Sequence, residues 1–147
     1  MGDRANIAIV QHPGDKSRKP QFLYFYTHWA GTEMPEDLQT ALKRGKERWD
    51  DEPYLARIIF CALLRGPKDL EETTGLAITT YITDNEYPLL VVDVEKQTVS
   101  AAPANAPTEP FKTVSFEQYC ALDEKGLRQF RKTKSEIAED NRDNEDD

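Results

Sequence analysis

Arg48, Tyr54 and Arg57 are the residues of this chain whose types and spacing are best suited to chemistry. They lie in segment 48–57, which joins two predicted helices and also holds a tryptophan and three acids. Tyr54 and Arg57 are three positions apart, so they share one face of a helix. A guanidinium binds phosphate through two parallel hydrogen bonds, and a tyrosine ring stacks on a base or ribose. The segment therefore predicts a site for a nucleotide-like anion.

Arg57 also has a purely structural explanation. The helix that carries it is apolar over most of its circumference, and an unpaired buried charge is costly. An ion pair with Asp50, Asp51 or Asp93 would satisfy Arg57 and tie the helix to the body of the protein. The sequence leaves both explanations open.

Five further residues are candidates for the same site. His28 and Trp29 end a predicted strand, where the histidine could act as acid, base or phosphate donor and the tryptophan as a stacking platform. The alternative is an edge histidine beside a core tryptophan. Thr79, Tyr81 and Asn85 offer neutral hydrogen-bonding groups for a base or sugar, although Thr and Tyr are also ordinary strand formers.

Signals for catalysis or for a metal are weak. His12 and His28 are the two histidines, and the chain has no HxxxH motif and no close cysteine pair, so no zinc site is expected. The Asp93-Val94-Glu95 run could ligate magnesium, but adjacent acids at a strand end usually face water. Cys61 lies mid-helix among apolar neighbours, which disfavour its reactive thiolate form. We expect no catalytic residue, no metal and no cofactor.

Composition restricts the class of protein. A chain of 147 residues suits one domain. Its net charge of −8, from 19 basic and 27 acidic residues, disfavours nucleic-acid binding and is compatible with docking on a basic partner protein. Two distant cysteines form no disulfide framework, and no stretch is apolar enough to cross a membrane. We therefore expect a protein of the cytoplasm.

Hydrophobic periodicity and turn residues predict the elements that must position these side chains. The predicted strands cover 6–11, 21–29, 75–82, 88–94 and 97–101, and the predicted helices cover 35–49, about 51 to a stop at Gly66-Pro67, and 116–122. Short loops between the last three strands predict an antiparallel meander, since they leave no room for crossovers.

Together these elements predict a single α+β domain over 1–122, in the order β-β-α-α-β-β-β. We expect a mostly antiparallel sheet with two helices on one face, and a proline-rich linker at 102–110. The strand at 22–27 is apolar on both faces, so the far face should also be covered, and a homodimer or higher oligomer is expected. Residues 123–147 form a charged tail, partly helical over 124–138 and then disordered.

Several phrases resemble a family of small uncharacterised bacterial and phage proteins. The resemblance rests on MGDRAN, YTHW, RWDDEPYLARIIF and DNEYP and on segment 74–81, and it covers about residues 1–100. It implies a protein of phage-like genomes and no particular mechanism.

Three functional hypotheses follow. The first is a non-enzymatic, phage-encoded, anti-defence protein that sequesters a nucleotide-like anionic small molecule. The second is an acidic inhibitor that docks on a basic host protein through its surface and tail. The third is a phosphodiesterase or other hydrolase that uses His28 with an acid such as Asp50 or Asp84.

Overall fold

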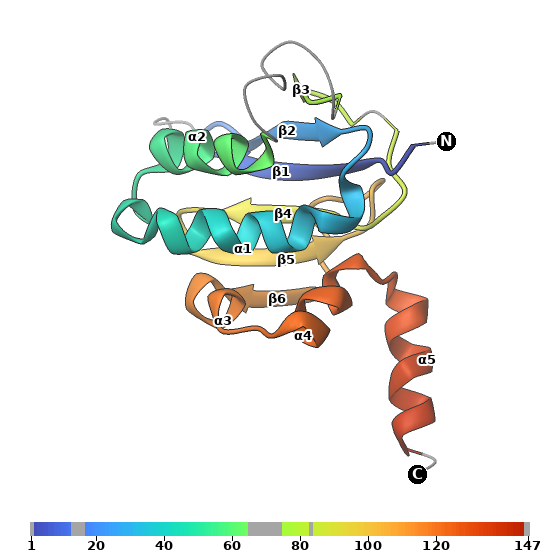
Figure 1. The fold of residues 1–147 in the computed structure, drawn as a ribbon. Coiled ribbons are helices and arrows are strands. Elements are labelled where there is room, and N and C mark those ends of the chain that lie inside the picture. Colours follow the sequence, from blue (N-terminus) through green and yellow to red (C-terminus); the bar gives the residue numbers. More distant parts are fainter. Residues whose placement is uncertain (1, 13–16, 65–74, 83, 146–147) are drawn as a thin grey trace.

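A six-stranded sheet forms the centre of the molecule (Figure 1). The computed structural model describes residues 2–12, 17–64, 75–82 and 84–145. The strands are β1 (Ala5–Gln11), β2 (Gln21–Thr27), β3 (Ala77–Thr79), β4 (Leu89–Asp93), β5 (Thr98–Ala102) and β6 (Lys112–Ser115). Their order across the sheet is β3-β2-β1-β4-β5-β6, and only β1 and β4 run parallel. The α+β class is confirmed, with a mixed sheet that is mainly antiparallel.

The meander predicted over 75–101 is wrong in its first half. β3 pairs with β2 and not with β4. In the sheet, β2 and β1 lie between β3 and β4. The connection from β3 to β4 spans residues 80–88, long enough to cross two strands at about 5 Å per strand. The hairpin of β4 and β5 is present as predicted. β6 adds a strand at positions that the sequence left unassigned.

Helices cover one face of the sheet. They are α1 (Met34–Arg44), α2 (Glu52–Leu63), α3 (Phe116–Cys120) and α4 (Glu124–Arg128), with 3-10 turns at η1 (Gly31–Glu33), η2 (Lys46–Arg48) and η4 (Gln129–Arg131). The single helix predicted over 35–49 is thus interrupted at Gly45. A Cβ on Gly45 would lie 2.8 Å from Leu55 Cδ1, so this glycine allows α1 and α2 to pack closely.

α2 buries one stripe and exposes the other. Leu55, Ile59 and Leu63 are buried, whereas Arg57 and Cys61 are exposed. The sequence predicts a largely buried helix, and this holds for the apolar side of α2, whereas its polar line, Tyr54, Arg57 and Cys61, is exposed. Asp51 caps its start by accepting a hydrogen bond from the Tyr54 N–H. The predicted stop at 66–67 lies outside the described residues.

The opposite face of the sheet carries a second apolar cluster. It consists of Ala8, Val10, Tyr24, Leu89, Val91 and Ala102, with Phe22 and Ile82 packed against them. β2 therefore contributes apolar side chains to both faces, as its sequence predicts. The helices α1 to α4 lie on the other side, so this face is lined by strand side chains and loops.

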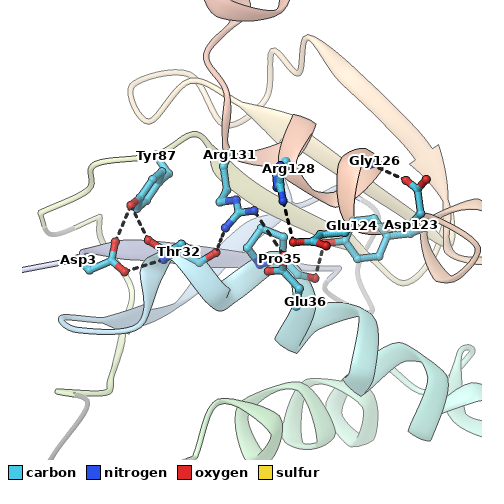
Figure 2. A network of polar contacts seen from close by, with 11 residues as sticks. Asp3, Thr32, Pro35, Glu36, Tyr87, Asp123, Glu124, Gly126, Arg128 and Arg131 are labelled. Atoms are coloured by element: carbon cyan, nitrogen blue, oxygen red, sulfur yellow. Dashed lines mark hydrogen bonds and ion pairs between the residues drawn. The ribbon is translucent and has the colours of Figure 1, made fainter.

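The C-terminal part is fastened to the start of α1. Arg131 in η4 donates hydrogen bonds to the Thr32 carbonyl and to the Glu36 carboxylate, as Figure 2 shows. α5 (Lys134–Glu145) then projects away from the body (Figure 1). Thr133 precedes α5, and its side chain accepts from the Glu136 N–H. Within the described ranges, every helix falls short of the length and apolarity that a membrane span needs.

Candidate functional site

The eight residues singled out from the sequence lie in two separate regions. The Asp3 N–H donates to the His28 carbonyl, so His28 lies beside the start of β1. The His12 N–H donates to Glu52, so the start of α2 lies beside the end of β1. β1 has seven residues and is therefore about 23 Å long. The α1–α2 junction is thus a strand length away from His28 and Trp29.

Arg48, Tyr54 and Arg57 form what we term the arginine stack. The Cζ atoms of Arg48 and Arg57 lie 4.5 Å and 4.4 Å from the centroid of the Tyr54 ring. All three side chains are exposed, and within the described residues no ion pair joins either arginine to an acid. The stacking is a cation–π interaction, which leaves the edges of the guanidinium groups available to an anion.

His28 and Trp29 form a smaller aromatic group at the other end of β1. The Tyr26 hydroxyl lies 2.8 Å from His28 Nδ1, and the rings of His28 and Trp29 meet edge to face with centroids 4.3 Å apart. Trp29 is 52% exposed, so the alternative interpretation of Trp29 as a core residue is wrong. Gly75 has φ of 66° and packs against His28, where a Cβ would come within 2.7 Å of the histidine Cβ.

Of the neutral polar candidates, Thr79 and Asn85 have hydrogen-bond partners within the protein, whereas the Tyr81 side chain is 66% exposed. Thr79 donates its hydroxyl proton to the Tyr81 carbonyl at 2.6 Å. The Asn85 side chain donates to the Tyr87 carbonyl and accepts from Asn6 at 3.2 Å. These hydrogen bonds hold the segment between β3 and β4. They also occupy the polar groups of Thr79 and Asn85 that would otherwise be available to a ligand.

A groove of about 440 Å³ lies on the sheet face opposite the helices. We term it the sheet groove. Its apolar lining comes from Val10, Phe22, Val91, Pro20, Pro107 and Pro110. Its neutral polar lining comes from Thr98, Ser100, Thr108 and Thr113, with the hydroxyl oxygens of Ser100 and Thr113 2.9 Å apart. The groove therefore offers an apolar floor with a pair of hydroxyl groups, which suits a small ligand.

One end of the sheet groove is charged. His12, Lys19, Asp93 and Lys96 line this end, and a neighbouring hollow of about 200 Å³ adds Arg18. The same hollow also adds Glu52, so the combined lining holds three basic side chains, Arg18, Lys19 and Lys96, and two acids, Asp93 and Glu52. Basic side chains therefore slightly outnumber acids at this end, in a chain whose net charge is −8.

His12 holds this end of the sheet groove together. Its Nε2 lies 3.0 Å from Asp93 Oδ1, and its Nδ1 lies 2.9 Å from Glu95 Oε2. Each ring nitrogen of His12 therefore has a carboxylate oxygen within hydrogen-bond distance. Its backbone N–H donates to Glu52 at 3.3 Å, and burial raises the pKa of that carboxyl above its ordinary value.

The sequence did not single out the sheet groove. Its residues come from positions 10–22, 91–100 and 107–113, and only the parallel pairing of β1 with β4 brings the first two groups together. The available signals were the basic loop at 16–19 and the acids at 93 and 95. Among the described residues, no cluster of three or more His, Cys, Asp or Glu side chains is arranged to hold a metal ion.

No protein-family model, curated protein or solved structure matches this chain. Its function must therefore be inferred from its own residues and their arrangement.

Proposed function

We propose that this is a non-enzymatic binding protein that holds a nucleotide-like anionic small molecule in the sheet groove. The observation that carries the proposal is an apolar groove with basic side chains at one end, in a chain of net charge −8. Its volume of about 440 Å³ falls in the range of small-molecule sites, roughly 300–1,000 Å³.

The lining fits the two parts of such a ligand. A planar apolar ring would lie against Phe22 and Val91, where burial of both surfaces is favourable. The hydroxyl groups of Ser100 and Thr113 would meet the polar edge of the ring. Lys19 and Lys96 would attract the anionic group, and His12 would offset the negative charge of Asp93.

Binding without turnover is favoured over hydrolysis by the state of the two histidines. Both ring nitrogens of His12 contact carboxylates, so neither is available to accept a proton from a nucleophile. His28 Nδ1 is engaged with the Tyr26 hydroxyl, and Asp84 forms an ion pair with Arg4. The hydrolase hypothesis needs His28 to pair with an acid. Instead, His28 contacts Tyr26 and Asp84 contacts Arg4.

The biological setting remains the one that the sequence suggests. A phage-encoded protein in the bacterial cytoplasm would act against host defence by sequestering a signalling nucleotide. Sequestration requires that the protein bind the nucleotide and does not require a reaction. The groove offers groups for binding, namely the Phe22 ring, the hydroxyl groups of Ser100 and Thr113, and nearby lysines.

Isothermal titration calorimetry tests this proposal. The titrants are nucleoside phosphates, cyclic dinucleotides, cyclic oligonucleotides and cyclic ADP-ribose isomers. We expect one class to bind, and the double variant Lys19→Gln, Lys96→Gln to lose roughly ten- to hundredfold in affinity, as for charged hydrogen bonds. The double variant Lys43→Gln, Lys125→Gln is the matched control, because it removes the same two charges and neither of these exposed lysines lines the groove. Equal affinity in all three proteins, or no binding by any titrant, would contradict the proposal.

A further inference from the structure

The arginine stack is a cationic surface without an acidic partner among the described residues. The distances of Arg48 and Arg57 from the Tyr54 ring place the two guanidinium carbons within about 9 Å of each other. Two like charges at this separation repel, and an acid between them would relieve the repulsion. Of the nearby acids, Asp51 caps α2 and Glu52 accepts from His12, and within the described residues neither Glu47 nor Asp50 forms an ion pair with Arg48 or Arg57. The stack is thus open to an acid from outside.

α5 is the complementary element. Its sequence, KSEIAEDNRDNE, holds five acids and two basic residues, and two more aspartates follow it. A helix that is polar around its whole circumference gains little from packing on its own domain, and α5 projects into solvent (Figure 1). Glu139 is exposed and forms no hydrogen bond or ion pair with another described side chain, whereas Asp140 pairs with Lys132. At least one acidic position of α5 is therefore available to a partner.

The stack and α5 of one chain lie at opposite ends of α1. Arg131, just before α5, bonds to Thr32 and Glu36 at the start of α1, as Figure 2 shows. Arg48 follows the end of α1, which is 11 residues and about 16 Å long. α5 extends away from this helix and not along it (Figure 1). The acidic helix therefore cannot reach the stack of its own chain.

We infer that α5 of one copy docks on the arginine stack of a second copy. The acids of α5 approach the exposed edges of Arg48 and Arg57, and Tyr54 holds both guanidinium groups in place. The contact joins two different surfaces, so it is head-to-tail and either closes into a ring or continues along a chain of copies. Electrostatic attraction dominates it, and salt therefore weakens it.

Sedimentation velocity of the full chain over a concentration series is the first test. At about 0.01 M salt, where the Debye length is roughly 30 Å, the weight-average mass should rise with concentration. At about 1 M salt, where the length is roughly 3 Å, the protein should be monomeric. A monomer at every concentration in low salt would overturn the inference. A monomer that binds added polylysine through α5 would also overturn it, because α5 would then serve a basic partner other than a second copy.

Charge exchange locates the contact. Arg57→Glu and Glu139→Arg should each abolish self-association, and a mixture of the two variants should associate again, because the carboxylate introduced at position 57 then meets the guanidinium introduced at position 139. Lys125→Glu changes the net charge by the same amount as Arg57→Glu and should associate like the parent protein. Loss of association in Lys125→Glu, or a mixture that stays monomeric, would overturn the inference.

Removal of residues 134–147 gives an independent check that does not alter the stack. The shortened chain should be monomeric and should keep its near-ultraviolet circular dichroism, since α5 projects from the body and holds no aromatic residue, while the far-ultraviolet helix signal falls by the contribution of α5. If the shortened chain self-associates as strongly as the full chain, the interface does not include α5 and the inference is overturned.

Discussion

His12 is the side chain on which the charged end of the sheet groove depends. It joins the end of β1 to Asp93, to Glu95 in the turn before β5, and to Glu52 at the start of α2. Its ring is largely enclosed, whereas Glu95 is mostly exposed. Most of the energy of this cluster should therefore come from Asp93, since an ion pair in water contributes little.

Replacement of His12 by alanine should lower stability and anion affinity together. The variant leaves Asp93 without its ring partner, which should cost about 1–3 kcal/mol in the free energy of unfolding. Urea unfolding measures this change. Asp93→Asn in the same chain should recover part of the loss by removing the unpaired charge. If the double variant is as unstable as the sum of the two single variants, the pairing of His12 with Asp93 carries no energy.

Thr113→Trp tests the sheet groove by filling it. Thr113 lies on β6 at the edge of the sheet, where tryptophan is a favourable strand residue. We expect ligand binding to be lost while the midpoint of thermal unfolding changes by only a few degrees. Thr113→Val, which removes the hydroxyl group but little volume, should bind with intermediate affinity. Unchanged binding by the tryptophan variant would place the ligand outside the groove.

Asp3 provides a prediction about pH. Burial alone would raise the pKa of Asp3, but hydrogen bonds from the Tyr87 hydroxyl and the Thr32 N–H outweigh burial and lower the pKa (Figure 2). A lowered pKa in the folded state adds stability above the unfolded value of 3.8, and this stability is lost as pH falls through the folded value. Asp3→Asn should therefore be less stable than the parent near neutral pH, and the gap should close in acid. Urea unfolding across a pH series would refute this if the gap were constant.

At the scale of elements, α3 connects β6 to the core. Ser115 and Gln118 form a capping box at its start, and Phe116 and Tyr119 within it are fully buried. The Tyr119 hydroxyl also donates to the Pro35 carbonyl, which joins α3 to α1. A short helix of this kind depends on its cap, because it has few internal hydrogen bonds.

Ser115→Ala should therefore destabilise the protein by about 1 kcal/mol, the usual value for loss of an N-cap. Ser115→Asp keeps an acceptor at the same position and should retain most of the stability. Chemical denaturation of the three proteins gives the comparison. A loss in the aspartate variant as large as that in the alanine variant would mean that the cap is not the cause.

Local patterns account for the elements that the sequence predicted well. β1, β2, α1 and the start of α2 follow from short apolar runs bounded by turn residues, from Pro35 and from the Asp51 cap, all of which act within a few residues. The pairing of β3 with β2 depends on contacts between distant parts of the chain, which periodicity does not encode. Arg48, Tyr54 and Arg57 were found together because helical spacing is local, whereas their exposure depends on which side of α2 packs.

At the scale of the molecule, the helices use one face of the sheet and leave the other to loops. This arrangement creates the sheet groove, since the proline-rich segment meets the strands without filling the space above Val91 and Ser100. Charge is divided unevenly, with basic side chains at the groove and at the arginine stack and an acidic helix at the C-terminal end. A net charge of −8 is therefore compatible with two surfaces that present basic side chains, at the sheet groove and at the arginine stack.

The most direct measurement is a ¹H–¹⁵N correlation titration of the full chain with the nucleotide class that binds in calorimetry. The proposal predicts that amide shifts concentrate at Val10, Val91, Ser100 and Thr113, around the sheet groove. Shifts concentrated at Arg48, Tyr54 and Arg57 would contradict it and would assign the small anion to the arginine stack.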